Sequence, residues 1–414
     1  MTDNMKRELV VIGGGPAGLA AAIAAKKEGC RDILLIERDR ILGGILNQCI
    51  HDGFGLHRFG EPLTGPEYAQ RYIDDFHETD IDALLGAIVL SMDRHRNLYV
   101  SSRSGFTKIQ ADAVVLAMGC RERTAGALSL AGTRPAGIYT AGAAQNMINL
   151  QNIMVGERAV VLGSGDIGMI MARRMVLEGA RVEAVFEILP YASGLPRNIR
   201  QCLEDYDIPL HLNTTVTEIH GKDRITGVSV AQVDENRRPV SGTERRVSCD
   251  TLLLSVGLIP ENELSRAAGV RMEARTNGAF VDDDFMGSIP GVFSCGNVLH
   301  VHDLVDHVSE EAARAGECAA RYLRGERGKA GTYVEIHPRD GTRYVLPQRV
   351  SGMQDFTLSL RVNEPSRNRA VLVRDRGRKV ARKKIIRLHP AEMVRIPVKA
   401  KKIEDARTLE VTVE

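Results

Sequence analysis

The feature that most constrains this chain is a motif that occurs twice, about 150 residues apart. Each copy has a short apolar run, the glycine pattern G-x-G-x-x-G, a helix-like segment, and a second apolar run that ends in glutamate. The copies are ELVVIGGGPAGLAAAIAAKKEGCRDILLIER (8–38) and RAVVLGSGDIGMIMARRMVLEGARVEAVFEI (158–188). Short apolar runs of this kind are typical of parallel strands buried on both faces. The sequence therefore predicts two β-α-β units and an α/β fold.

The first glycine pattern has the spacing that a dinucleotide needs. Gly13 would allow a tight turn, Gly15 would let the backbone approach a pyrophosphate, and Gly18 would let the helix pack on its strand. The helix N-terminus would offer free N–H groups and a positive dipole end to the phosphates. Glu37, at the end of the second strand, could accept a hydrogen bond from a ribose hydroxyl. The first unit is therefore predicted to bind a dinucleotide.

The second unit repeats the same layout and predicts a second dinucleotide. Its glycines are Gly163, Gly165 and Gly168, and its acid is Glu187. A carboxylate here would accept from a 2′-hydroxyl and repel a 2′-phosphate. No arginine follows Glu187 directly, since Arg197 is ten residues away. The sequence therefore favours NADH over NADPH. An alternative to two dinucleotide sites is that one of the two copies of the motif has lost its site.

Charge and cysteine content limit the other classes of function. The chain has 414 residues with 55 basic and 53 acidic side chains, and this balance gives no reason to expect nucleic acid or a membrane surface as partner. No apolar run approaches the roughly 20 residues that span a bilayer. The seven cysteines never form a C-x-x-C pair, which argues against a disulfide framework and a structural zinc site. We expect a cytoplasmic protein without a membrane span.

Two clusters of polar residues need an interpretation. In GGILNQCIHDGFGLHRFG (43–60), Cys49 could be a redox nucleophile, a metal ligand with His51 and His57, or a packing residue. The intervening glycines fix no ligand spacing, which disfavours a metal. A second cluster, HVHDLVDHVSEEA (300–312), is interpreted as polar groups at a helix start, so no metal site is predicted.

The last eighty residues have a different pattern. Seven short segments rich in β-branched residues are separated by Gly, Pro, Asn and Asp turns, with Arg376–Gly377 as a hairpin turn. This predicts a small antiparallel β-sandwich over residues 331–414. Residues 374–402 hold twelve Lys or Arg and two acids. Two interpretations stay open, a docking surface for an acidic partner and the solvated face of ordinary strands.

Three further stretches carry a family resemblance: ADAVVLAMGCRER (111–123), CDTLLLSVGLIPENEL (249–264) and GVFSCGNVLHVHDLVDHVSEEAARAGECAARYL (291–323). Together with the two glycine motifs, they make the chain resemble the pyridine nucleotide–disulfide oxidoreductase superfamily, in the layout of low-molecular-weight thioredoxin reductase. The resemblance implies an FAD domain split over residues 1–125 and 275–330. It implies an NAD(H) domain inserted at 126–274, ahead of the all-β domain at 331–414.

The resemblance also implies which residues would hold the cofactors. The family has a Gly-Asp turn at the position of Gly296–Asn297, so asparagine replaces aspartate here, and a helix from about Asp303 would point its N-terminus at the flavin. The expected FAD contacts are Gly13, Gly15, Pro16, Ala17, Gly18, Glu37, Arg38, Gly43, Gly44, Ile45, Leu46, Asn47, Gln48, Ala117, Gly119, Gly296, Asn297, His302 and Asp303. The expected NAD contacts are Gly163, Gly165, Asp166, Ile167, Gly168, Glu187 and Gly257.

The redox disulfide of such enzymes is missing. Thioredoxin reductases have a C-x-x-C ahead of the second glycine motif, and the matching stretch GIYTAGAAQNMINLQNIMVGERAV (137–160) has no cysteine. Relatives of the glutathione reductase type need C-x-x-x-x-C after the first unit, where this chain has only Cys49. The sequence therefore excludes dithiol exchange within one chain.

The stretches GGILNQCIHDGFGL and CGNVLHVHDLVDHVSEEA resemble, more narrowly, a subgroup of these flavoproteins without redox cysteines. Its members accompany glycerol-3-phosphate-, opine- or proline-type dehydrogenases. This implies an oligomeric enzyme that moves electrons between NADH, bound FAD and a partner flavoprotein or small redox protein. The alternatives are an NADH oxidase or peroxidase that uses Cys49, and a non-catalytic subunit that binds nucleotides.

Overall fold

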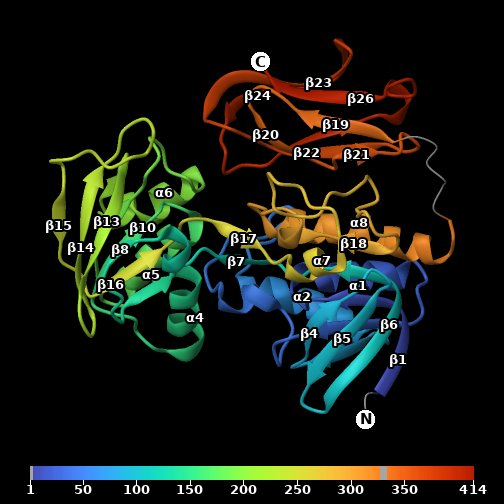
Figure 1. Ribbon diagram of the computed structural model, residues 1–414, viewed down its shortest axis with the longest axis horizontal. Coiled ribbons are helices and arrows are strands. Elements are labelled where there is room, and N and C mark those ends of the chain that lie inside the picture. The colour runs from blue at the N-terminus through green and yellow to red at the C-terminus, as the bar shows by residue number, and fades with distance from the viewer. Residues whose placement is uncertain (1–2, 327–332) are drawn as a thin grey trace. The chain divides into compact units, whose positions relative to one another are not determined.

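The computed structural model describes residues 3–326 and 333–414. The contacts divide the chain into two units, Met1–Cys120 with Pro260–Glu414, and Arg121–Ile259 (Figure 1). Within the described ranges, none of the helices combines the length and apolar character that a bilayer crossing requires. Each unit is described separately below.

The first unit is built on a seven-stranded sheet. Its order is β3-β2-β1-β6-β5-β4, and β18 pairs with β6. β1, β2, β3, β6 and β18 are parallel neighbours, whereas β4 and β5 join antiparallel. The predicted run Leu9–Ile12 is the buried end of β1 and pairs with Ile33–Ile36. The bounds are β1 Asp3–Ile12, β2 Ile33–Glu37, β3 Asp82–Leu85, β4 Ile88–Met92, β5 Asn97–Ser102, β6 Gly105–Leu116 and β18 Val292–Ser294.

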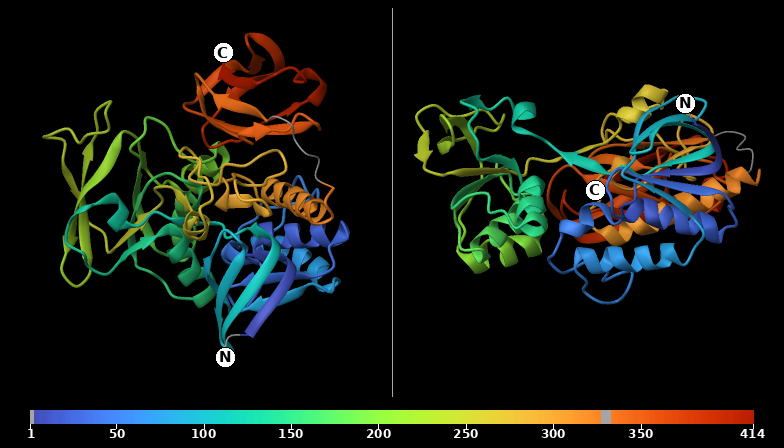
Figure 2. Two further views of the ribbon diagram at one scale, coloured as in Figure 1. Left: turned by 45° about the vertical axis from the view of Figure 1, so that its right-hand side comes forward. Right: turned by 90° about the horizontal axis from the view of Figure 1, so that it is seen from below.

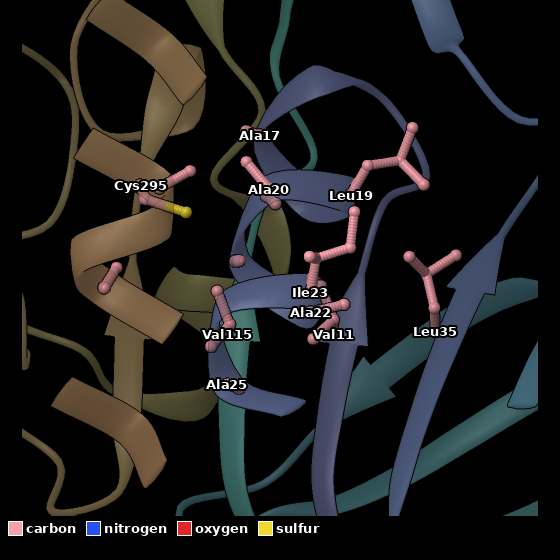
Figure 3. Packing of buried hydrophobic residues seen from close by; sticks show 14 of the residues in the cluster. Val11, Ala17, Leu19, Ala20, Ala22, Ile23, Ala25, Leu35, Val115 and Cys295 are labelled. Atoms are coloured by element: carbon pink, nitrogen blue, oxygen red, sulfur yellow. The ribbon is translucent and has the colours of Figure 1, made fainter. Parts of the chain in front are cut away.

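Two helices lie against each other beside this sheet (Figures 1 and 2). Leu19 and Ile23 of α1 pack with Val11 and Leu35 of the strands (Figure 3). On α8, a Cβ at Gly316 would lie 2.1 Å from the carbonyl oxygen of Ala21, so the two helix backbones touch. The helices of this unit are α1 Pro16–Lys27, η1 Gly44–Gln48, α2 Gly65–His77, α7 Glu263–Ala268, η3 Gly296–Val298 and α8 Val305–Leu323.

The second unit repeats the parallel arrangement on a smaller scale. Its five-stranded sheet has the order β12-β11-β10-β16-β9, and a four-stranded sheet β15-β14-β13-β8 accompanies it. The strands are β8 Ala131–Gly132, β9 Ile138–Thr140, β10 Arg158–Leu162, β11 Arg181–Phe186, β12 Leu210–His211, β13 Thr214–Gly221, β14 Ile225–Gln232, β15 Arg245–Val247 and β16 Thr251–Leu254. The helices are α3 Ala125–Leu128, α4 Ala141–Gln151, α5 Asp166–Leu177, α6 Pro196–Cys202 and η2 Glu204–Tyr206.

The chain passes from the first unit to the second and back through a pair of short strands, β7 Cys120–Glu122 and β17 Leu258–Pro260. The sequence had placed residues up to 274 in the inserted domain, and this boundary is too late. The amide of Asn262 donates to the carbonyl oxygens of Asn277 and Val298, at 2.8 and 2.7 Å. These bonds hold α7 in the first unit.

The C-terminal strands form two sheets, ordered β21-β19-β26-β23-β24 and β20-β22-β25. Arg376 and Gly377 take positive φ angles of 47° and 84° and form the predicted hairpin turn. The sheets are not wholly antiparallel, because the last strand enters between β19 and β23 and runs parallel to β19. The bounds are β19 Val334–Pro338, β20 Thr342–Leu346, β21 Arg349–Val350, β22 Phe356–Val362, β23 Ser366–Asp375, β24 Arg378–Leu388, β25 Val394–Val398, η4 Ala400–Lys402 and β26 Thr408–Val413.

Specific hydrogen bonds connect these sheets to the rest of the first unit. The side-chain oxygen of Gln348 accepts from the backbone N–H of Val281 at 2.9 Å. The buried carboxylate of Asp283 accepts from both the backbone N–H and the hydroxyl of Ser351. On the sheet edge, the basic residues of β24 are exposed, and Ile386 is 82% exposed. This exposure is consistent with a docking surface for an acidic partner and equally with the solvated face of ordinary strands.

The contact between α1 and α8 predicts the effect of a single methyl group. Gly316→Ala raises helix propensity, but its Cβ meets the backbone oxygen of Ala21, which cannot move aside. We expect the free energy of unfolding to fall by about 1–3 kcal/mol, as for other overpacked cores. Chemical denaturation measures this, with Glu317→Ala on the same helix as the control. An unchanged or higher stability of Gly316→Ala would contradict the close packing.

Candidate functional site

The first glycine motif forms the tight turn that its sequence predicts. Gly13 has a φ of +108°, and a Cβ there would lie 2.5 Å from the carbonyl oxygen of Ala117. A Cβ at Gly18 would lie 1.7 Å from the carbonyl oxygen of Gly13. A Cβ at Gly15, in contrast, would meet nothing among the described residues closer than the Cα of Gly44, 3.9 Å away. The backbone at Gly15 is therefore open where a ligand would have to approach.

The segment that follows β2 packs against this turn. The backbone N–H of Gly43 donates to the carbonyl oxygen of Gly14 at 2.9 Å. The amide of Asn47 donates to the carbonyl oxygen of Leu42 at 2.9 Å, so this side chain supports the loop's own backbone. Of the other residues predicted here, Leu46 and Gln48 are buried and Ile45 is 59% exposed.

Glu37 is buried at the end of β2, and it organises the glycine turn. Its carboxylate accepts the backbone N–H of Gly14 at 2.5 Å and that of Asp39 at 2.8 Å. A buried carboxylate requires such donors to offset the loss of its hydration. Arg38, the neighbouring residue that was also predicted to contact the cofactor, is exposed.

The turn after β18 completes this part of the site. A Cβ at Gly296 would lie 2.8 Å from the Cβ of Ala17, which places this turn beside the start of α1. Asn297 accepts the backbone N–H of His302 at 3.0 Å through Oδ1. Gly119 has a φ of +73°, and a Cβ there would meet none of the described residues within 4 Å, so its face is open as well.

The helix α8 begins two residues later than predicted, because Leu304 is extended, with φ −128° and ψ 131°. Asp303 therefore precedes the helix. Its carboxylate accepts the backbone N–H of Met393 at 3.2 Å and lies 3.6 Å from Arg361. Both partners belong to the C-terminal strands, so Asp303 contacts that domain.

A buried group of two histidines and one carboxylate lies next to the Gly296 turn. The Nε2 atoms of His300 and His302 lie 2.8 and 3.4 Å from Oε2 of Glu311. The other oxygen of Glu311 accepts the backbone N–H of Gly296 at 2.8 Å. Burial lowers the pKa of His300 to about 4, against the opposing effect of Glu311. Burial raises the pKa of Glu311, but the two histidines outweigh it and hold this pKa well below its ordinary value.

Sequence reasoning missed the role of Asp306. This side chain is 5% exposed and accepts the backbone N–H groups of Gly55 and Arg58, at 3.2 and 2.8 Å. It thereby fixes the loop that follows Cys49. The only sequence signal is an acid between the apolar residues Val305 and Val308 of an amphipathic helix.

The structure disfavours a reactive role for Cys49. Its thiol lies 3.3 Å from the carbonyl oxygen of Ile45, and burial raises its pKa to about 12. Little thiolate is present at neutral pH, and the thiolate is the nucleophilic form. Among the described residues, Cys49, His51 and His57 do not gather at metal-ligand spacing.

The second glycine motif has the same arrangement as the first, in which a buried glutamate accepts hydrogen bonds from the glycine turn. Glu187 is 3% exposed and accepts the backbone N–H and the hydroxyl of Ser164, at 2.9 and 2.5 Å. Gly163 has a φ of +90°, and the backbone N–H of Gly168 donates to the hydroxyl of Ser255 at 3.1 Å.

The remaining residues predicted for this site have structural contacts of their own. Asp166 accepts from the backbone N–H of Leu195 at 2.7 Å and from the amide of Asn198 at 2.6 Å, so it contacts the N-terminal part of α6 and the residue that precedes this helix. Gly165 is the N-cap of α5, and Ile167 follows in its first turn. Gly257 has a φ of +105° and accepts from the backbone N–H of Arg123.

Comparisons with known proteins find a matching family model and several relatives. A family model described as "Pyridine nucleotide-disulphide oxidoreductase" matches residues 7–317. The HcnB component of hydrogen cyanide synthase from Pseudomonas protegens is 25% identical over 80% of this chain and 73% of its own length. One of the opine oxidase subunits of Agrobacterium tumefaciens is 26% identical over 70% of this chain and 61% of its own length.

A third relative is the ferredoxin–NAD(+) reductase subunit of the benzene 1,2-dioxygenase system of Pseudomonas putida. It is 28% identical over 71% of this chain and 67% of its own length. Among solved structures, thioredoxin reductase of T. acidophilum superposes with a TM-score of 0.62 at 22% identity, over 78% of this chain and 98% of that chain. This likeness bears on the fold alone.

The raised pKa of Cys49 predicts its alkylation behaviour. Since the thiolate reacts, the rate of iodoacetamide labelling should rise about tenfold per pH unit from pH 7 to 9 without levelling off. Peptide mass spectrometry measures this rate, with free cysteine as the reference, whose rate levels off near its own pKa of about 8.5. A plateau for Cys49 below pH 8 would reveal an activated thiol.

Proposed function

Because the chain belongs to the pyridine nucleotide-disulphide oxidoreductase family, we propose that it is an FAD-dependent NADH oxidoreductase. It would transfer electrons between NADH and bound FAD, and then to or from a partner protein or small acceptor. The observation that carries this proposal is the duplicated unit in which a buried glutamate, Glu37 or Glu187, accepts the N–H groups of a glycine turn.

The residues of the first unit fit FAD. The open backbone at Gly15 and Gly44 leaves room for the close approach of a pyrophosphate, and the N-terminus of α1 supplies N–H groups for it. Glu37 would accept a hydrogen bond from the adenosine ribose. The open face of Gly119 and the Gly296 turn would border the remainder of the cofactor. When bound, FAD supplies the hydride and electron chemistry, which no side chain of this protein can perform.

The second unit would hold NADH. Its carboxylate at Glu187 is suited to a ribose 2′-hydroxyl and would repel the 2′-phosphate of NADPH. The N-terminus of α5, beginning after Gly165, would bind the pyrophosphate. These residues bind and orient the nucleotide, and they do not take part in the chemical step.

The acceptor or donor would be a partner protein or a small molecule, and not a disulfide within this chain. The sequence contains neither the C-x-x-C nor the C-x-x-x-x-C spacing that dithiol exchange within one chain requires. Several relatives are named as subunits or as ferredoxin reductases, which supports a partner flavoprotein dehydrogenase or a small redox protein. The raised pKa of Cys49 counts against the alternative of a single-cysteine oxidase or peroxidase.

An anaerobic titration tests this proposal. We expect the chain purified with FAD to show the flavin band at about 450 nm. NADH should bleach this band rapidly and NADPH should do so more slowly. Cys49→Ser is the matched control, and it should bleach at the same rate as the unchanged protein.

Each contrary result has a specific meaning. Protein that holds no flavin would overturn the proposal as a whole. Flavin that stays oxidised with NADH, even beside its partner, would identify a non-catalytic nucleotide-binding subunit. Turnover with oxygen or peroxide that is lost in Cys49→Ser would favour the single-cysteine enzyme.

A second prediction concerns the choice of nucleotide. Glu187→Gln keeps an oxygen acceptor for Ser164 but removes the charge that would repel a 2′-phosphate. We expect the ratio of flavin reduction rates, NADH over NADPH, to fall about tenfold, which corresponds to about 1.4 kcal/mol. Stopped-flow absorbance measures both rates. Glu178→Gln, an exposed acid of the same unit, should leave the ratio unchanged.

A further inference from the structure

The group formed by His300, His302 and Glu311 has the composition of a metal site. Its three ligand atoms lie within 4.8 Å of one another, and the exposed fractions of the side chains are 1%, 2% and 10%. The histidines precede α8 and the glutamate lies on it, so two separate segments contribute. Two imidazoles and one carboxylate are typical ligands of zinc and ferrous iron, and they are unlike the all-oxygen sets that bind calcium or magnesium.

The outer nitrogens of the two rings are also held. His302 Nδ1 lies 3.3 Å from Oδ1 of Asn297, and His300 Nδ1 lies 3.3 Å from the hydroxyl of Tyr344. Both Nε2 atoms therefore turn toward the carboxylate. Metal-binding histidines are commonly oriented in this way, by a hydrogen bond to the ring nitrogen that does not bind the ion.

The hydrogen bonds at His302 leave a place for a cation. Oδ1 of Asn297 accepts the backbone N–H of His302, which fixes the amide orientation. Because His302 Nδ1 faces that same oxygen, Nδ1 must carry the ring's hydrogen. The Nε2 atom of the same ring therefore faces Oε2 of Glu311, 3.4 Å away, and both of these atoms are able to bind a metal ion.

The distances between the ligand atoms also suit a metal ion. Ligands about 2.1 Å from a tetrahedral zinc lie about 3.4 Å from each other. The separation of His302 Nε2 and Glu311 Oε2 has this value, and that of His300, at 2.8 Å, needs to open by about half an ångström. His302 and Glu311 also line a cleft between α8 and the C-terminal strands, which offers a path for the ion and space for a water as fourth ligand.

We propose that His300, His302 and Glu311 bind one divalent transition-metal ion such as Zn²⁺. The ion connects the segment after Gly296 to α8 and, through the contact of His300 with Tyr344, to strand β20 of the C-terminal domain. The site belongs to the first unit alone. Its test needs no nucleotide, so its outcome is independent of the proposed oxidoreductase activity.

Metal content of the full-length chain is the decisive measurement. The protein is stripped with a chelator, equilibrated with Zn²⁺, desalted and analysed by mass spectrometry of the metal. We expect about one zinc per chain and a melting temperature raised by about 3 °C or more. Glu311→Gln and His302→Asn should each lower the bound zinc at least tenfold. His307→Gln, which alters the same cleft outside the trio, should retain it.

Three results would overturn the proposed metal site. Less than about one tenth of an ion per chain in the unchanged protein, with Zn²⁺, Mn²⁺ and Fe²⁺ alike, would overturn the proposal. Zinc retained in both trio variants would place the ion elsewhere and overturn it too. If circular dichroism shows both variants unfolded, Co²⁺ bound to the unchanged protein decides. Visible bands typical of nitrogen and oxygen ligands support the site, and their absence overturns it.

Discussion

The carboxylates of Glu37 and Glu187 are buried at the ends of two parallel strands, and burial obliges each of them to find hydrogen-bond donors. In both units, a donor is the backbone N–H of the residue after the first glycine, Gly14 or Ser164. The position of the acid and the shape of the glycine turn are therefore set together. In each unit, one buried charge thus holds together the two parts of the proposed site, the carboxylate proposed to bind a ribose and the glycine turn proposed to face a pyrophosphate.

Local patterns made much of the fold predictable. The elements β1, α1 and β2 follow one another within 35 residues, and the hairpin at Arg376–Gly377 depends on two adjacent residues. The predictions that failed depend on distant partners. The boundary at 274 was wrong because Asn262 bonds to Asn277 and Val298, and the all-antiparallel sandwich was wrong because β26 pairs with β19, about seventy residues earlier in the chain.

In the candidate site, too, the features set by local sequence could be predicted and those set by distant partners could not. The glycines could be identified from their spacing, and at Gly13 and Gly18 the close approach of the backbone leaves no room for a Cβ. Asp306 could not, because the N–H groups that it accepts belong to Gly55 and Arg58, about 250 residues away. The sequence indicated only that residues 300–312 carry polar groups at the start of a helix. In the structure, Asp306 is instead buried against the loop that follows Cys49, and it acts on that loop's backbone.

Asn297 shows how one substitution can be understood from the groups around it. The related enzymes that this chain resembles carry aspartate in this turn, and here the side chain lies 3.3 Å from His302, whose other nitrogen faces Glu311. An aspartate would put a second negative charge on the same imidazole in a buried region, at a large desolvation cost. The amide keeps the acceptor that His302 requires without adding that charge. Asparagine at 297 and glutamate at 311 are therefore best explained together, as a set that leaves one carboxylate for two histidines.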